Sequence, residues 1–223
     1  KEVIFMSRST FDLHLEALHN YVLRMGSIVE KQIHDSTEAL ITHNVKLAQK
    51  VIKDDDLVDN LEKEIEDRCI KLIATEQPLA KDLRMIFTAT KIITDLERMA
   101  DHAVDIAKIG IMLKDEKFIK PLIDIPKMSG LVKDMIREGL DAYVEGNVDK
   151  AYSVCKKDDE IDAIYRGVFK EMLPIMANDQ STINQATQFL FICKYLERVA
   201  DHVTNICEWT IYLVTGEIMD LNE

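Results

Sequence analysis

The stretch Leu96-Glu97-Arg98-Met99-Ala100-Asp101-His102-Ala103 returns, 100 residues later, as Leu196-Glu197-Arg198-Val199-Ala200-Asp201-His202-Val203. Neither copy contains Gly or Pro, and each lies within a long pattern of apolar residues at helical spacing. Self-similarity at a fixed shift indicates an internal duplication. The sequence therefore predicts a chain built from two equivalent helical units.

The match extends well beyond these two copies. Residues 25–59 align with residues 128–162 without a gap, and Asn44-Val45 falls on Asn147-Val148. Apolar side chains recur every three or four positions in each unit, which predicts three helices per unit. The six predicted helices occupy residues 10–44, 45–74, 78–113, 128–145, 148–174 and 181–214, with Thr10 as the candidate N-cap of the first.

Pro121 and Pro126 mark the strongest candidate for a linker between the two units. Within each unit the predicted turns are short, so sequential helices are expected to lie side by side as antiparallel neighbours. We therefore predict an all-α fold of two pseudo-symmetric three-helix bundles, the first at residues 8–120 and the second at residues 121–223.

Composition excludes several classes of protein. The 223 residues include 28 basic and 40 acidic side chains, a formal net charge of −12, which argues against nucleic-acid binding. The four cysteines form no Cys-x-x-Cys pair, as expected of core thiols in a reducing compartment. No stretch approaches the roughly 20 apolar residues of a membrane span, and the start lacks the pattern of a signal peptide. We therefore expect a cytoplasmic protein.

The repeated stretch carries a pair of carboxylates in each copy. Glu97 and Asp101 are four residues apart, as are Glu197 and Asp201, so each pair lies on one helix face. Both glutamates fall on or beside the apolar stripe of their helix, where a core residue is expected. An unpaired carboxylate there is costly unless a metal ion or a basic side chain meets it.

A second acidic pair occurs in each unit. Asp55 and Asp59 correspond to Asp158 and Asp162, near the start of the preceding helix. If the two helices are neighbours, four carboxylates converge in each unit. Sets of oxygen ligands suit hard cations, so we predict a metal site in each unit, with the ion's identity open among iron, Mn, Mg, Zn and Ca.

The two predicted sites are unequal. Asp105 lies one turn beyond Asp101, whereas the corresponding residue of the second unit is Asn205. A fifth carboxylate favours tighter binding, so we expect the first unit to hold metal more strongly. A single Asp-x-x-x-Asp motif is a weak signal, because solvated helices contain many such pairs. Only the duplicated arrangement of two pairs in each unit favours a metal site over an ordinary solvated helix surface.

Other polar residues near the motif have less specific interpretations. Arg98 and Arg198 are expected to form structural ion pairs, with contact to a phosphate-like anion as the alternative. His102 and His202 lie about 100° around the helix from the neighbouring aspartates and are not expected as metal ligands. Glu62 is expected to be a surface acid.

No catalytic centre is apparent. The Glu-x-x-His motif of carboxylate-bridged di-iron bundles is absent, as are a phosphate-binding Walker loop and a nucleophile elbow. We therefore predict a protein that is not an enzyme. The competing hypothesis is a metal-dependent enzyme acting on a phosphorylated small molecule, because metals held by carboxylates can hydrolyse phosphates without a protein nucleophile.

Several stretches carry a resemblance to a known family. They are Arg-Ser-Thr-Phe at residues 8–11, Gln-Pro-Leu-Ala-Lys-Asp-Leu-Arg at residues 77–84, the repeated motif at residues 96–102, and residues 196–216. Together they resemble the PhoU family, the accessory and signalling proteins of phosphate-specific transport. One departure is alanine at positions 100 and 200, where the family often has glycine.

The resemblance implies a cytoplasmic protein, often a homodimer, that represses the phosphate-starvation response. The implied partners are a phosphate-sensing histidine kinase and the ATPase subunit of the phosphate ABC transporter, with no insertion into the membrane. The family's metal clusters sit on Glu/Asp-x-x-x-Asp motifs. In this sequence those motifs are Glu97/Asp101 and Glu197/Asp201, with Asp55/Asp59 and Asp158/Asp162 opposite.

Overall fold

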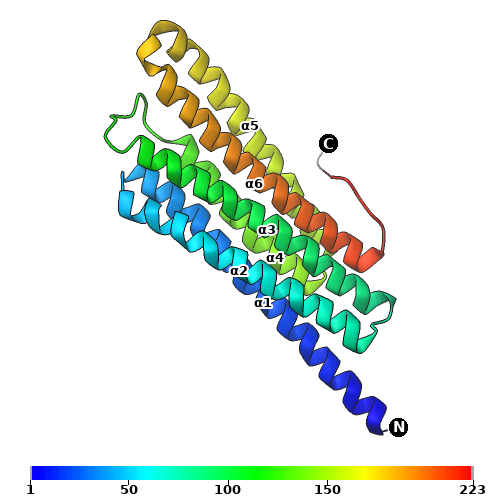
Figure 1. Cartoon of the computed structure of the whole chain (residues 1–223). Coiled ribbons are helices and arrows are strands. Elements are labelled where there is room, and N and C mark those ends of the chain that lie inside the picture. The colour runs from blue at the N-terminus through cyan, green and yellow to red at the C-terminus, as the bar shows by residue number, and fades with distance from the viewer. Residues whose placement is uncertain (1, 222–223) are drawn as a thin grey trace.

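The computed structural model of the chain describes residues 2–221, with side chains from Thr10 onward. These residues form six long α-helices and one short 3-10 turn (Figure 1). The elements are α1 (Glu2–Ile41), α2 (Val45–Glu76), α3 (Ala80–Met112), α4 (Asp124–Glu145), α5 (Val148–Asn178), η1 (Gln180–Thr182) and α6 (Ile183–Thr215).

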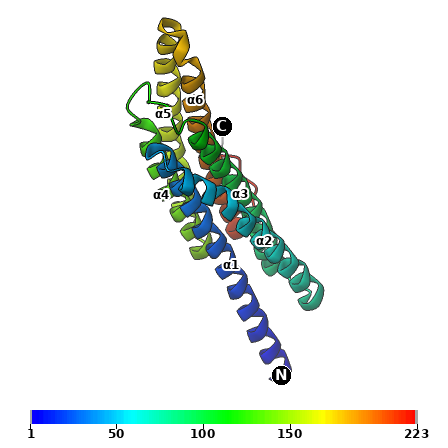
Figure 2. The same ribbon diagram turned by 60° about the vertical axis from the view of Figure 1, so that its left-hand side comes forward.

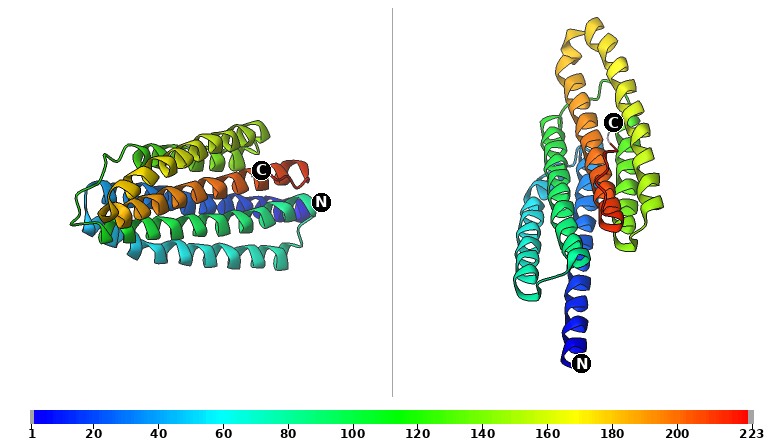
Figure 3. Two further views of the ribbon diagram at one scale, coloured as in Figure 1. Left: turned by 90° about the horizontal axis from the view of Figure 1, so that it is seen from above. Right: turned by 90° about the vertical axis from the view of Figure 1, so that its right-hand side faces the viewer.

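The helices form two three-helix bundles, α1–α3 and α4–α6, so the predicted all-α duplicated fold is confirmed. α3 packs against α1, α2 and α6, and α6 packs against α3, α4 and α5. α2 and α5 have no contact with the opposite bundle and lie toward the two edges of the molecule (Figure 3). The two helices that carry the repeated motif are therefore the central pair.

α3 and α6 run side by side in opposite directions (Figure 1). Phe87, near the start of α3, contacts Trp209, near the end of α6, with ring centroids 5.9 Å apart. Beyond the other end of α3, the backbone N–H of Ile119 donates to Gln185 at the start of α6 over 2.7 Å. This antiparallel arrangement brings equivalent positions of the two repeats together at the middle of the pair.

A single hydrophobic core runs through both bundles. α1 also packs against α4, and there Gly26 allows a close approach, because a Cβ at this position would lie 2.1 Å from Cδ1 of Leu140. The repeats are thus joined by tight side-chain packing as well as by the linker.

The duplicated turn between the first two helices of each unit is built in the same way. Asn44 and Asn147 each cap the following helix, accepting hydrogen bonds from the backbone N–H groups of Leu47 and Lys150 over 3.1 and 3.0 Å. The preceding residue is left-handed in both units, with φ of 51° at His43 and 61° at Gly146. Only the second unit uses the glycine that this conformation favours.

Several predicted helix ends are wrong. α1 begins at Glu2, so Thr10 lies inside the helix and is not its N-cap, and the first turns of α1 extend beyond the other helices (Figure 2). α4 begins at Asp124, with Pro126 in its first turn, where a missing N–H costs little. α5 continues through Pro174 to Asn178, so the proline lies inside the helix and removes one backbone hydrogen bond without ending it.

None of the described helices combines the length and the apolarity needed to cross a bilayer.

Candidate functional site

Four carboxylates of the first unit meet between two adjacent helices. Asp55 and Asp59 project from α2, and Glu97 and Asp101 from α3, which packs against α2. Burial raises the pKa of Asp55 to about 6, and the charges of Asp59 and Asp101 contribute to that increase. These four residues are called the first cluster below, and their role as metal ligands stays a prediction.

Arg98 partly balances the first cluster. Its guanidinium lies 3.3 Å from a Glu97 oxygen and 3.0 Å from an Asp101 oxygen, so the arginine pairs with acids of its own helix. Burial and the Asp101 charge still raise the pKa of Glu97, against the opposing effect of Arg98. The charge of Glu62 also raises the pKa of Glu97. The sequence predicts Glu62 as a surface acid, but in the structure its side chain is half-buried beside the first cluster. Its spacing of seven residues from Asp55 is the signal that places it on the same helix face.

The second cluster consists of Asp158 and Asp162 on α5 with Glu197 and Asp201 on α6. Burial raises the pKa of Asp158 to about 7, with contributions from the charges of Asp201, Asp162 and Glu197. One oxygen of Asp158 is buried and accepts no hydrogen bond from any described residue. A buried carboxylate oxygen without a donor is costly, and a cation would satisfy it.

The second cluster has a cation of its own. Nζ of Lys194 lies 2.6 and 2.5 Å from the two oxygens of Glu197. Burial raises the pKa of Glu197, and Lys194 opposes that increase. In the first repeat this position is Thr94, which carries no charge. Each glutamate therefore has a basic partner, Arg98 for Glu97 and Lys194 for Glu197, and the lysine is the closer of the two.

The chemistry of both clusters fits a hard cation, since each gathers carboxylate oxygens whose charges are incompletely balanced. Within residues 2–221, however, no three His, Cys, Asp or Glu side chains are close enough together to hold one ion as they stand. Metal coordination by these acids requires side-chain rotation within each cluster and stays a prediction.

Asp105 lies in a cleft and not at the centre of the first cluster. It is 3.3 Å from Nζ of Lys108 and shares the open cleft, of about 570 Å³, with Asp55 and Asp101. The cleft runs along the seam between α3 and α6 and is called the seam cleft below. Its lining is completed by Arg98, His102, Val104, Lys108, Arg198 and His202.

The two repeated histidines have different partners at this seam. His202 lies 2.9 Å from Asp95, measured from Nδ1 to Oδ1, and Nδ2 of Asn205 donates to the same oxygen over 3.0 Å. His102 instead stacks on Tyr195, with ring centroids 5.4 Å apart. Burial lowers the pKa of His102 to about 4, and the charges of His202 and Arg198 contribute. Neither imidazole is bonded to a carboxylate of the two clusters.

Asp95, like Glu62, is a polar residue of this region that the sequence analysis did not identify. It is 8% exposed and lies between the fully buried Ile93 and Leu96. A charged residue within an apolar stretch is itself a signal of a buried partner, but nothing in the local sequence identifies that partner as His202, which is 107 positions away.

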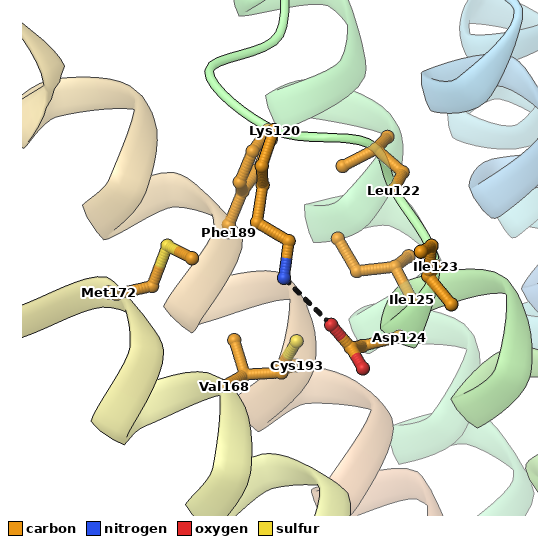
Figure 4. A pocket seen from close by; sticks show the side chains of 9 residues that line it. All are labelled: Lys120, Leu122, Ile123, Asp124, Ile125, Val168, Met172, Phe189 and Cys193. Atoms are coloured by element: carbon orange, nitrogen blue, oxygen red, sulfur yellow. Dashed lines mark hydrogen bonds and ion pairs between the residues drawn. The ribbon is translucent and has the colours of Figure 1, made fainter. Parts of the chain in front are cut away.

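A second hollow lies beneath the linker and is not a binding site. Lys120 reaches across it to Asp124, over 2.9 Å (Figure 4). Lys120 also pairs with Glu171. The space measures about 10 Å³, which is at or below the lower limit for one water molecule. Its other lining side chains are apolar except for the thiol of Cys193. The ion pairs of Lys120 with Asp124 and Glu171 hold the linker against the second bundle.

Comparison with known proteins places this geometry in a family. The family model described as the PhoU domain matches the chain twice, at residues 22–110 and 125–210. The chain is 54% identical over 219 residues to a phosphate-specific transport system accessory protein PhoU homolog of Clostridium acetobutylicum, covering 98% of this chain and 100% of that protein. A homolog from Aquifex aeolicus is 41% identical, covering 92% and 93%.

Two solved structures have the same fold. The crystal structure of PhoU from Pseudomonas aeruginosa superposes with a TM-score of 0.89 at 34% identity, covering 93% of this chain and 100% of that chain. The phosphate transport system regulatory protein PhoU from Streptococcus pneumoniae gives a TM-score of 0.88 at 34% identity, with 94% and 99% covered.

Proposed function

The chain belongs to the PhoU family, and from this premise we propose that it is a metal-binding regulator of phosphate uptake and signalling that restrains the phosphate-starvation response. Its relatives are named as accessory or regulatory proteins of phosphate-specific transport. The observation that carries the metal part is the pair of four-carboxylate clusters, whose half-buried aspartates Asp55 and Asp158 have raised pKa values.

The proposed ligands are the residues predicted from the duplicated pattern. Asp55, Asp59, Glu97 and Asp101 hold metal in the first unit, with Asp105 one turn away. Asp158, Asp162, Glu197 and Asp201 hold metal in the second unit. A bound cation neutralises mutually repelling carboxylates on two helices of one bundle and thereby ties those helices together.

The proposed regulator works by contact with other proteins and not by catalysis. Its proposed partners are the ATPase subunit of the phosphate ABC transporter and a phosphate-sensing histidine kinase, in the cytoplasm, with the protein itself a homodimer. The names of the relatives support an accessory role beside a transporter. The acidic surface, with a net charge of −12, favours partners with complementary basic faces.

Deletion of the gene tests the regulatory role. Phosphate-starvation genes should remain active in phosphate-rich medium, and normal repression in that strain would rule the role out. Co-purification with the transporter ATPase or the kinase tests the partners. In parallel, elemental analysis of protein purified without chelator should find at least one bound cation per unit.

A turnover assay separates this proposal from the enzymatic hypothesis. The metal-loaded protein is incubated with generic phosphomonoesters in the presence of Mn²⁺ or Mg²⁺, and no release of phosphate above a metal-only control is expected. Turnover that is lost in Asp101→Ala and Asp201→Ala would favour the enzyme instead.

A further inference from the structure

The basic residues of the repeated motif meet in one place, although the motif's acids go to two separate clusters. Arg98 and Arg198 both line the seam cleft, as do His102 and His202, whose ring centroids are 6.0 Å apart. This convergence follows from the antiparallel packing of α3 against α6. We propose that the seam cleft binds inorganic phosphate as the hydrogenphosphate ion.

Arg198 supplies the first part of the argument. Its side chain is exposed, lines the cleft and makes no hydrogen bond or ion pair with any residue that the structure describes. A guanidinium offers five donors in a planar fork that matches two oxygens of a phosphate group. An arginine that is tied to no carboxylate is free to make that bidentate contact.

His202 supplies the second part. A carboxylate oxygen of Asp95 lies 2.9 Å from Nδ1, so Nδ1 donates its hydrogen and the ring orientation is fixed. The other ring nitrogen, Nε2, has no hydrogen-bond partner among the described residues. In the neutral ring Nε2 accepts a hydrogen bond, and hydrogenphosphate carries one hydroxyl to donate. Sulfate and the dianion of a phosphomonoester carry none.

Three carboxylates in the same cleft oppose an anion and must be accounted for. Arg98 is bound by Glu97 and Asp101, and Lys108 is bound by Asp105. Asp55 adds a further negative charge. In the metal-free protein the cleft is therefore close to neutral, and phosphate should bind weakly.

A cation in the first cluster changes that balance, and this step rests on the proposed function. Metal bound to Glu97 and Asp101 takes the oxygens that Arg98 now contacts and releases the guanidinium toward the cleft. Phosphate affinity then rises with metal occupancy. By thermodynamic linkage, phosphate raises the affinity for the metal by the same factor.

Calorimetric titration of inorganic phosphate into the full chain at pH 8 tests the proposal. The protein is first loaded with Mn²⁺, freed of unbound metal by desalting, and its metal content measured. Arg198→Gln is expected to weaken phosphate binding about tenfold or more while leaving the metal content unchanged. Arg137→Gln is the control, because this arginine on α4 is exposed, as Arg198 is, and lies outside the cleft.

Two competing anions test the role of His202. Sulfate and methyl phosphate should bind about tenfold or more weakly than phosphate, because each would leave the Nε2 acceptor without a donor. In His202→Gln this preference should disappear. Equal binding of phosphate and sulfate by the unsubstituted protein would overturn the assignment of Nε2.

The failure of the metal proposal and the failure of this one can be distinguished. If the loaded protein contains no metal, the proposed function fails, and the titration is repeated on that same protein. If phosphate binding by this metal-free protein still depends on Arg198, the result would support the phosphate site in the seam cleft and overturn its coupling to metal binding. Phosphate affinity that is equal in Arg198→Gln and Arg137→Gln, with or without metal, would overturn the site.

Discussion

His202 and Asp95 form a hydrogen-bonded pair across the seam between the two repeats, with Nδ1 and Oδ1 2.9 Å apart. The pair has no symmetric counterpart. The residues at the equivalent positions are His102 and Tyr195, which meet by ring stacking. Equivalent positions of the two repeats therefore make different contacts: a hydrogen bond between His202 and Asp95, and ring stacking between His102 and Tyr195.

This pair should contribute measurably to stability. We expect Asp95→Ala and His202→Ala each to destabilise the fold, with a coupling energy of about 1–3 kcal/mol in a double-mutant cycle, because either substitution leaves a mostly buried partner unsatisfied. Urea unfolding followed by circular dichroism gives the values. Strictly additive effects of the two substitutions would show that the link is energetically unimportant.

The half-buried Asp158 of the second cluster predicts how the stability of the protein varies with pH. The ordinary pKa of an aspartate is 3.8, whereas the pKa of Asp158 in the folded protein is about 7, so the native state holds this proton more strongly than the unfolded state. Stability of the metal-free protein should therefore fall as pH rises from about 4 to about 7 and then level off. After discounting for solvent screening, the loss from this residue is about 1–2 kcal/mol.

Asp158→Asn tests that assignment. The metal-free variant should be more stable than the unsubstituted protein at pH 8 and should lose part of the pH dependence, because the amide has no charge to bury. Asp12→Asn, at an exposed position of α1 that does not contribute to the pKa of Asp158, is the control and should change neither. A pH profile that is the same in both variants would contradict the raised pKa.

The two clusters should bind metal with unequal affinity. We expect Asp101→Ala to abolish the tightest class of sites and Asp201→Ala to spare it. Asp105 adds a carboxylate near the first cluster only, and the Lys194–Glu197 ion pair of the second cluster, at 2.5 Å, is closer than the Arg98–Glu97 pair of the first, at 3.3 Å. Titration with Mn²⁺, followed by electron paramagnetic resonance, measures free and bound ions. Equal loss in both variants would mean that neither Asp105 nor Lys194 affects binding.

Lys194→Thr provides the matched variant, since it gives the second repeat the residue that the first repeat has at position 94. Removing the ammonium group from Glu197 should raise the affinity of the second cluster roughly three- to tenfold. Affinity that is unchanged or lower would show that the lysine does not compete with metal.

The packing between the bundles predicts opposite effects of two glycine substitutions. Gly26→Ala should destabilise the protein by about 1–3 kcal/mol, because its Cβ would overlap the side chain of Leu140, which must move within a filled core. Gly130→Ala on α4 meets nothing within 4 Å and should stabilise by about 0.5–1 kcal/mol through helix propensity. Thermal unfolding compares the two. A neutral Gly26→Ala would show that Leu140 has room to rotate.

Some features of the site follow from the sequence alone because their causes are local. Helical periodicity places Glu97 and Asp101 on one face, and the duplication repeats that face as Glu197 and Asp201. The same periodicity predicts six helices, and the predicted starts at Val45 and Val148 are correct. Helix ends are less determined, as Thr10 and Pro174 show, because a few residues more or less of helix differ little in free energy.

The sequence by itself therefore determined a duplicated helical chain and the acidic face that each repeat presents. Only the tertiary structure decided what those faces meet. Which helices lie against each other depends on the packing of the whole core. No local pattern could therefore predict that Asp95 pairs with His202, or that Arg198 lines the seam cleft between α3 and α6. The antiparallel packing of α3 against α6 gathers the arginines and histidines at one seam while the acids diverge to two clusters.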